Sequence, residues 1–243
     1  MNPTFVLYII RIKLIQIIML TMKQRDYFKD NVKPEDTPSI GYFGDSFCAD
    51  DSKHSWCQIL ARNISHWPVH WGKEGSSVWH VFLTIEEMIA NGTLPDTIFI
   101  CYTEPYRIYH KEKALTSNSD NSGELNKAAD MYRVYLQNNS KDNLAYRYAI
   151  QWFDQHVLKN LESKHKIIQM WSMNPKDIMN PQTKIELNTG LCLENSILDF
   201  AYRSVNAGPG FQFPVEWSNH MTEDGNYNFA KHLYQKVNSY LKQ

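Results

Sequence analysis

From Ser39 to the C-terminus, short β-rich runs alternate with longer amphipathic segments, and this alternation constrains the fold more than any other feature of the sequence. The β-rich runs are Ile40–Phe43, residues 67–72, Asp96–Thr103 and Lys166–Ser172. The segments with helical periodicity are His54–Asn63, residues 76–92, Glu124–Gln137, Asn143–Leu161 and Glu223–Leu241. Strands that alternate with helices are typical of a parallel sheet covered by helices. The pattern predicts an α/β layer fold with a mostly parallel central sheet.

The length and composition favour a single domain that follows an N-terminal extension. With 243 residues, 43% of them apolar, the chain is long enough to bury one sizeable core. We place this domain at residues 38–243 and the extension at residues 1–37. Within residues 174–214, which carry several prolines and glycines, only residues 194–204 (ENSILDFAYRS) show a helical pattern.

The extension contains one strongly apolar run, FVLYIIRIKLIQIIML at residues 5–20. A bilayer-spanning helix needs about 20 apolar residues, and Arg11 and Lys13 stand near the centre of this shorter run. Each such charge costs about 2.5–3.5 kcal/mol at the middle of a membrane. No small-residue cleavage site of a signal peptide follows Leu20. We therefore expect a peripheral or poorly ordered extension, with membrane contact through residues 5–20 as the less favoured alternative.

The charge balance and the cysteines limit the classes of partner. A net charge of −1 and a sequence pI near 6.7 provide no basic surface that would attract nucleic acid. The cysteines form no C-x-x-C pair, so neither a zinc cluster nor a disulfide framework is predicted; they are Cys48, Cys57, Cys101 and Cys192. The histidines at positions 66, 70 and 80 lack the spacing of metal ligands, because Pro68 interrupts it and no carboxylate accompanies them. Reduced thiols and a cytoplasmic location fit best, and the sequence predicts no metal.

The apolar run at Ile40–Phe43 leads directly into Gly-Asp-Ser at residues 44–46. A serine in an ordinary surface turn does not need to follow a buried strand. A serine nucleophile must be held where a substrate and backbone N–H groups can reach it. At the other end of the domain, His220 stands just before Thr222, which can cap the last helix. Loops at the carboxyl ends of the strands collect at one edge of an α/β sheet. We therefore predict that Ser46 and His220 meet at this edge as nucleophile and base.

These two segments resemble the motifs of the SGNH or GDSL hydrolases. The run GDSFCADD at residues 44–51 is similar to the family's nucleophile block, and HMTEDGNYNFA at residues 220–230 is similar to its terminal histidine block. The resemblance extends from Ser39 to the C-terminus and implies a three-layer, flavodoxin-like domain. It also implies that Ser46 is the nucleophile, that His220 is the base and that no cofactor takes part.

Two further blocks of the family supply donors to the oxyanion hole, besides the N–H of Ser46. In the second block, the run GKEGSSVW offers Gly72 and Gly75, and we expect Gly75 because it opens the following helix. The third block of the family reads Gly-x-Asn-Asp, but here the corresponding residues are CYTE, with Thr103 in the asparagine position. A threonine hydroxyl can donate one hydrogen bond. The resemblance therefore implies an oxyanion hole of Ser46, Gly75 and Thr103.

The triad aspartate of the family stands three residues before the histidine, and here Trp217 occupies that position. Two arrangements stay open. In the first, Glu216 reaches His220 through a rearranged loop. In the second, a Ser–His dyad operates, with its imidazole oriented by a backbone carbonyl.

The sequence thus predicts a serine ester hydrolase that forms an acyl-enzyme, with a small-molecule ester or an O-acylated carbohydrate as substrate. Glu104, Tyr106 and Arg107, which follow the third block, are expected to shape the substrate pocket. The alternative is a catalytically inactive SGNH-like domain that binds a glycan or a partner protein, which the changed asparagine and aspartate positions favour. The sequence predicts no particular oligomeric state.

Overall fold

The computed structural model describes residues 33, 35–105, 107–109, 127–128, 130–132, 134, 143–172, 185–194, 197 and 221–243. The chain divides into two compact units, Met1–Thr37 and Pro38–Gln243, and every helix and strand given below belongs to the second. The apolar run at residues 5–20 lies outside the described residues, and among the described helices none is long and apolar enough to cross a bilayer. The predicted helices at residues 124–137 and 194–204 are described only in part.

Within the described residues, five strands form the central sheet: β1 (Ser39–Phe43), β2 (Trp67–His70), β3 (Thr97–Tyr102), β4 (Lys166–Trp171) and β5 (Leu191–Cys192). Their order across the sheet is β2-β1-β3-β4-β5, and every neighbouring pair is parallel. This is the order of a flavodoxin-like, doubly wound domain. The predicted fold class is therefore confirmed, and so are the four predicted strands.

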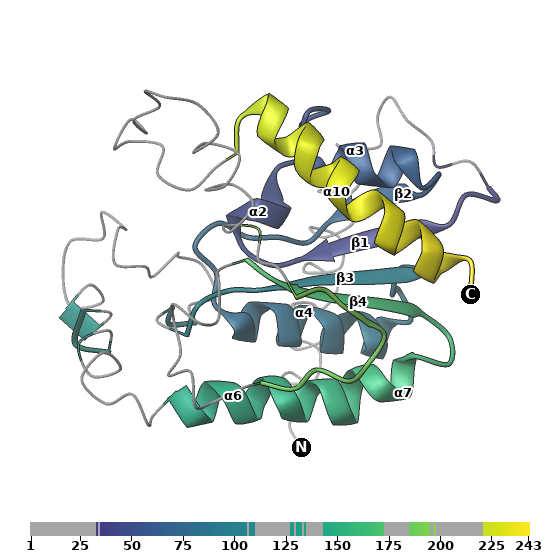
Figure 1. The fold of residues 1–243 in the computed structure, drawn as a ribbon. Coiled ribbons are helices and arrows are strands. Elements are labelled where there is room, and N and C mark those ends of the chain that lie inside the picture. Colours follow the sequence, from purple (N-terminus) through teal and green to yellow (C-terminus); the bar gives the residue numbers. More distant parts are fainter. Residues whose placement is uncertain are drawn as a thin grey trace, which may run out of the picture. The chain divides into compact units, whose positions relative to one another are not determined.

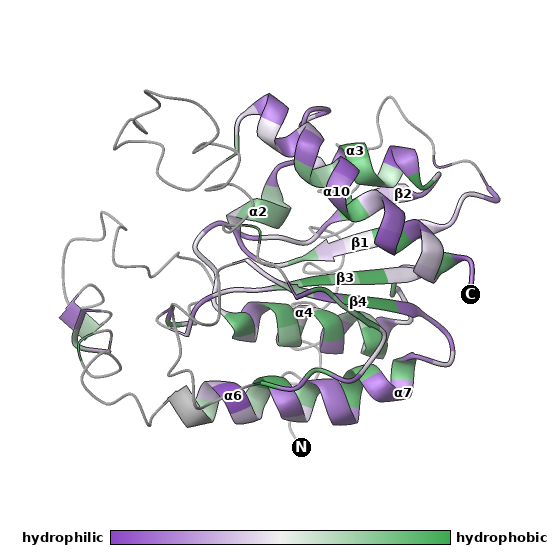
Figure 2. Ribbon diagram, viewed as in Figure 1, coloured by the Kyte–Doolittle hydropathy of each residue, from purple (hydrophilic) through white to green (hydrophobic). Residues whose placement is uncertain are grey.

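The strand β3 occupies the centre of the sheet because its sequence suits burial on both faces. All six of its residues, TIFICY, are buried, as expected of a parallel strand that helices cover on both sides. Figure 2 shows β3 as a largely hydrophobic segment of the sheet. In the register, Thr97 pairs with Ile40 of β1 and with Lys166 of β4. Asp96 accepts hydrogen bonds from the backbone N–H and the hydroxyl of Ser39, at 2.6 and 2.7 Å, which aligns the starts of β1 and β3.

Helices cover both faces of this sheet (Figure 1). The helices α3 (Trp56–Asn63) and α10 (Glu223–Leu241) lie on one face, and α4 (Val78–Asn91) and α6 (Asn143–Trp152) lie on the other. Each face has its own cluster of buried apolar side chains. The helices α3, α4 and α10 agree with the predicted segments to within a few residues, and the predicted three layers are confirmed.

The ends of the helices follow local sequence signals. The Ser55 hydroxyl caps α3 by accepting a hydrogen bond from the Gln58 N–H at 3.3 Å. The helix α4 ends at Gly92, which adopts a left-handed conformation with φ of 65°. The Thr222 hydroxyl accepts a hydrogen bond from the Gly225 N–H at 3.1 Å, so the predicted cap of α10 is confirmed.

One predicted helix is not a continuous α-helix. Its α-helical parts, α6 and α7 (Lys159–Leu161), flank the π-helical segment η1 (Phe153–Leu158). Within η1, the buried Asp154 carboxylate accepts hydrogen bonds from Gln169 Nε2 at 2.6 Å and from the backbone N–H groups of residues 188 and 189 at 2.9 and 3.2 Å. A π-helical turn is rare, and the apolar spacing of this segment gives no sign of it. The sequence pattern therefore predicts an uninterrupted helix.

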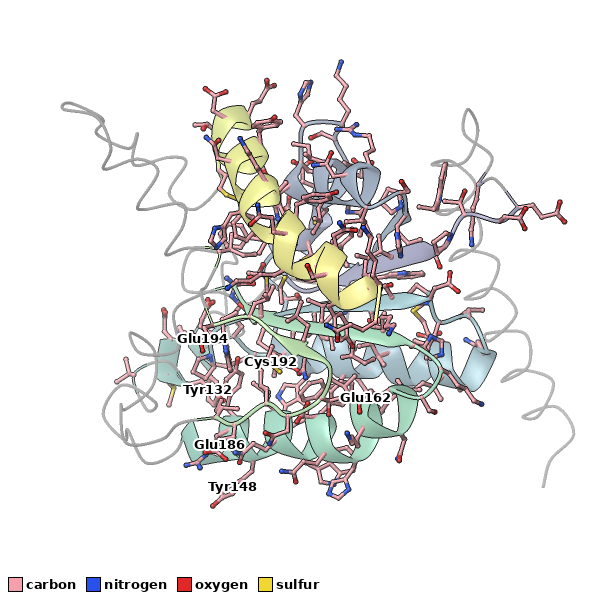
Figure 3. The ribbon with its side chains drawn as sticks, turned by 45° about the vertical axis from the view of Figure 1, so that its right-hand side comes forward. Tyr132, Tyr148, Glu162, Glu186, Cys192 and Glu194 are labelled. Atoms are coloured by element: carbon pink, nitrogen blue, oxygen red, sulfur yellow. The ribbon has the colours of Figure 1, made fainter. Side chains whose placement is uncertain are left out.

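The short strand β5 is not predicted by the sequence, because contacts with distant residues hold it. Gly190 precedes it with φ of 68°, and a Cβ at this position would lie 2.2 Å from the carbonyl oxygen of Ile167. The Gly190 N–H donates to Glu162 Oε1 at 2.9 Å. Figure 3 shows Glu162 just after α7 and Cys192 on β5. Only glycine fits this turn, and the turn directs the chain into β5.

Candidate active site at the carboxyl edge of the sheet

The described candidate residues stand at the carboxyl ends of neighbouring parallel strands. Ser46 follows β1, residues 72–75 follow β2, and Thr103 follows β3. The strand β1 lies between β2 and β3, so successive connections of the chain run to opposite sides of β1. In doubly wound sheets, such a switch point leaves a crevice outside the carboxyl ends of the strands, where ligands bind. The fold thus brings these residues to the edge at which α/β proteins bind their ligands.

Ser46 begins the short helix α2 (Ser46–Ala49), immediately after the turn that ends β1 (Figure 1). Asp45 is the N-cap of α2, and its Oδ1 accepts a hydrogen bond from the Phe47 N–H at 3.1 Å. Asp45 and Phe47 are buried, whereas Ser46 between them is partly exposed. Within the described residues, the Ser46 hydroxyl makes no hydrogen bond. The turn therefore presents one serine hydroxyl and buries the residues on both sides of it, as a nucleophile requires.

The loop after β2 packs closely against this turn because Gly72 has no side chain. A Cβ at Gly72 would lie 2.3 Å from the carbonyl carbon of Cys48 in α2. The Lys73 N–H and the Ser76 hydroxyl both donate to the carbonyl oxygen of Gly44, each at 3.1 Å. The loop after β2 is thus fixed to the residues that carry Ser46.

Gly75 stands in a turn of this loop and has φ of 62°, in the left-handed region that favours glycine. The Ser76 N–H closes the turn by donating to the carbonyl oxygen of Lys73 at 3.0 Å. Gly72 therefore determines where the loop lies, and the Gly75 N–H has no hydrogen-bond acceptor among the described residues.

Thr103, directly after β3, is buried, with 3% of its surface exposed. Its hydroxyl donates to Glu104 Oε2 at 2.8 Å, and its carbonyl oxygen accepts a hydrogen bond from the Tyr146 hydroxyl of α6. A hydroxyl carries a single proton, so Thr103 cannot donate to Glu104 and to a substrate oxyanion at the same time. The side chain in the asparagine position is thus already paired in this structure.

A buried group of charges lies next to Ser46. Arg107 Nε donates to Glu104 Oε1 at 2.5 Å, and Arg107 Nη1 lies 3.3 Å from Asp45 Oδ2, a contact without hydrogen-bond geometry. The Ser172 hydroxyl, after β4, donates to Asp45 Oδ1 at 3.3 Å. Burial raises the pKa of Asp45 above its ordinary value; Arg107 opposes this rise and Glu104 adds to it. Motif matching does not reveal these ion pairs, although the Glu-x-x-Arg spacing of residues 104–107 could have suggested one of them.

Four residues singled out in the sequence analysis lie outside the described residues: Tyr106, Glu216, Trp217 and His220. The residue after the histidine, Met221, is described, and its carbonyl oxygen accepts a hydrogen bond from Asn226 Nδ2 at 3.1 Å. Asn226 Oδ1 accepts from the Trp56 N–H at 2.9 Å, and the Trp56 indole N–H donates to the carbonyl oxygen of Phe47 at 2.9 Å. A chain of three hydrogen bonds therefore connects the neighbour of Ser46 with the neighbour of the histidine.

Among the residues that the structure describes, the other polar groups do not form a competing site. The described residues contain no group of three or more His, Cys, Asp or Glu side chains that could hold a metal. His70 stacks on Tyr42, and its Nδ1 lies 3.2 Å from the carbonyl oxygen of Cys48. The four cysteines are free, and Cys48 is fully buried, out of reach of a substrate. A cavity of about 430 Å³ lies at the opposite edge, near the starts of β1, β3 and β4, and none of the predicted site residues lines it.

Comparison with known proteins gives similarity in fold alone. No protein-family model and no curated protein matches the sequence. A protein assigned to the G-D-S-L lipolytic family from Desulfitobacterium hafniense is similar with a TM-score of 0.42 and 10% identity, over 82% of this chain and 99% of its own. An acetyl xylan esterase from the rumen bacterium Butyrivibrio proteoclasticus has a TM-score of 0.44 and 13% identity, over 88% of this chain and 66% of its own. A carbohydrate esterase whose active site displays divergent catalytic and non-catalytic binding functions has a TM-score of 0.40 and 14% identity, over 86% of this chain and 67% of its own.

Proposed function

We propose that this protein is a serine ester hydrolase that acts through an acyl-enzyme. The observation that carries the proposal is the turn after β1, where the partly exposed Ser46 stands between two buried residues at the switch point of the sheet. The loop after β2, which carries Gly75 and is called the Gly75 loop below, is held against this turn. The chain of hydrogen bonds that runs from Phe47 through Trp56 and Asn226 to Met221 further supports a histidine base near Ser46. It connects the two ends of the domain that carry the motifs.

In the proposed reaction, Ser46 Oγ attacks the carbonyl carbon of the ester while His220 takes the hydroxyl proton. The carbonyl oxygen becomes an oxyanion, which the N–H groups of Ser46 and Gly75 bind. Collapse of this intermediate breaks the ester C–O bond, and His220 gives the proton to the departing alcohol. Water then attacks the acyl-enzyme with the help of His220, which releases the acid and restores Ser46. If a triad operates, its acid is Glu216. If Glu216 takes no part, Ser46 and His220 work as a dyad.

As substrate we propose an O-acylated carbohydrate rather than an unspecific small ester. Trp79 lies in the first turn of α4, close in sequence to Gly75, and 47% of its surface is exposed. An exposed indole offers a flat apolar face with a polar edge, which suits the apolar face of a sugar ring. Trp71, by contrast, is partly buried against the cluster beneath α4 and is less available.

The second candidate function is binding without turnover, by an inactive SGNH-like domain that recognises a glycan or a partner protein. The pairing of the Thr103 hydroxyl with Glu104 favours it, because this pairing leaves the oxyanion two backbone donors and no side-chain donor. The tryptophan at position 217 favours it too, because no aspartate stands there to orient the histidine.

Reaction of the full chain with a fluorophosphonate and hydrolysis of p-nitrophenyl acetate distinguish the two candidates. We expect a covalent adduct on Ser46, located by mass spectrometry, and release of p-nitrophenol that the adduct abolishes. A panel of acetylated sugars and of short- and long-chain esters then identifies the acyl group and the alcohol. Binding of acetylated oligosaccharides without adduct or hydrolysis would contradict the hydrolase and favour the binding domain.

The role of the Thr103 hydroxyl has a separate test. Because Glu104 takes its proton, we expect Thr103→Val to lower kcat by less than about fivefold, whereas the loss of a working oxyanion-hole donor costs about 10²–10³-fold. The measurement is kcat for p-nitrophenyl acetate, with Thr103→Ser as the matched variant that keeps the hydroxyl. A hundredfold loss in Thr103→Val that Thr103→Ser restores would show that Thr103 is the third oxyanion donor after all.

A further inference from the structure

Arg107 contacts three of the loops at the edge of the sheet that carries Ser46. Its own loop follows β3, where its Nε donates to Glu104. Its Nη1 lies 3.3 Å from Asp45 Oδ2, in the turn after β1, and 3.5 Å from the carbonyl oxygen of Ser76, in the loop after β2. Only 9% of the Arg107 side chain is exposed. A single buried guanidinium therefore connects three chain segments that are far apart in the sequence.

The charges make these contacts stronger than surface contacts of the same kind. The carboxylates of Asp45 and Glu104 raise the pKa of Arg107 although burial acts in the opposite direction. A guanidinium offers several N–H groups in one rigid plane, whereas an ammonium is a single point charge. Breaking a buried ion pair leaves an uncompensated charge and is strongly unfavourable. The loss of Arg107 would therefore disturb the spacing of the three loops.

We infer that Arg107 is a positioning residue that fixes the oxyanion hole by holding the Ser46 turn and the Gly75 loop at a set distance. Asp45 directly precedes Ser46, and Ser76 directly follows Gly75, so Arg107 contacts a neighbour of each proposed N–H donor. Donors of this kind must stay within about 0.5 Å of the productive geometry. The inference rests on the proposed function, since it assigns the two N–H groups to the oxyanion.

The test compares Arg107→Lys and Arg107→Met with the wild-type full chain. We expect kcat for p-nitrophenyl acetate to fall about tenfold to hundredfold in Arg107→Met and less in Arg107→Lys, with KM changed by less than about threefold, because the oxyanion exists only in the transition state. The rate of fluorophosphonate labelling should fall by a similar factor. If Arg107→Met does not fold, Glu104→Gln, which keeps the shape of the pair but removes one charge, should lower kcat about fivefold at unchanged KM.

The matched control is Asp154→Asn. The Asp154 carboxylate is as fully buried as that of Asp45. Its hydrogen bonds within the described residues join η1 to β4 and to the loop before β5, and none of them involves Arg107. We expect this variant to lose thermal stability and to keep its kcat, which separates positioning from general destabilisation. Amide hydrogen exchange adds a readout that does not need activity: exchange at residues 44–48 and 72–77 should become faster in Arg107→Met and stay unchanged in Asp154→Asn.

The outcomes separate this inference from the proposed function. If wild type reacts at Ser46 but Arg107→Met keeps its kcat within about threefold and its slow amide exchange, Arg107 does not position the site and the inference fails. If wild type neither reacts with the fluorophosphonate nor hydrolyses the ester, the proposed hydrolase fails, and the assignment of Arg107 to an oxyanion hole fails with it. Amide exchange then reports only whether Arg107 holds the loops together.

Discussion

Replacing Ser46 with alanine is expected to lower kcat/KM for p-nitrophenyl acetate by about 10⁴-fold or more, because the reaction loses the oxygen that attacks the ester. The fold should survive. Ser46 is partly exposed, and its hydroxyl makes no hydrogen bond within the described residues. Asp45 still caps α2, since its bond to the Phe47 N–H does not involve the serine side chain. We therefore expect thermal unfolding of the variant to match that of wild type while the activity disappears.

The matched control for this variant is Ser52→Ala. Ser52 is exposed in the same stretch of chain, and among the described residues its hydroxyl bonds only a neighbouring carboxylate, Asp50, at 3.1 Å. Its removal should leave kcat/KM unchanged and fluorophosphonate labelling intact. A Ser46→Ala protein that keeps activity within about tenfold of wild type would show that another group performs the chemistry, and it would end the assignment of a serine nucleophile.

The elements that could be predicted from the sequence are those whose own pattern of apolar residues indicates that they are buried. The β-rich and mostly apolar run of β3 identifies a central strand, and the apolar spacing of α4 identifies its buried face from Val78 to Met88. The short elements could not be predicted, because distant residues hold them. The indole of Trp56 fixes α2 through the carbonyl oxygen of Phe47, and Glu162 fixes the turn before β5.

The candidate site divides in the same way. The position of Ser46 could be predicted because a Gly-Asp-Ser run follows an apolar strand, and the parallel sheet then places it at the carboxyl edge. The pairing of Thr103 with Glu104 could not be predicted, because a motif gives the residue type but not the acceptor to which the Thr103 hydroxyl donates its proton. Arg107 stands in a loop without periodicity, so only the structure shows that its buried charge joins the Asp45 turn to two other loops.

Replacing His220 with glutamine is expected to lower kcat/KM by about 10³–10⁴-fold, because Ser46 then lacks the base that takes its proton. In wild type, kcat/KM should rise with pH through an apparent pKa of about 6–7, as an imidazole loses its proton. The residual activity of His220→Gln should lack this rise. The measurement is the pH profile of kcat/KM for p-nitrophenyl acetate from pH 5 to 8.

The matched control for the histidine is His54→Gln, at an exposed imidazole 3.8 Å from Glu223 in the first turn of α10. Such a surface pair contributes little to stability, so this variant should keep the wild-type rate and the wild-type pH profile. The contrast between the two variants isolates the histidine that precedes α10 from a histidine that merely lies near it. A flat profile in wild type, or a His220→Gln protein within about tenfold of wild type, would contradict a histidine base at this position and would leave Ser46 without the group that makes it a nucleophile.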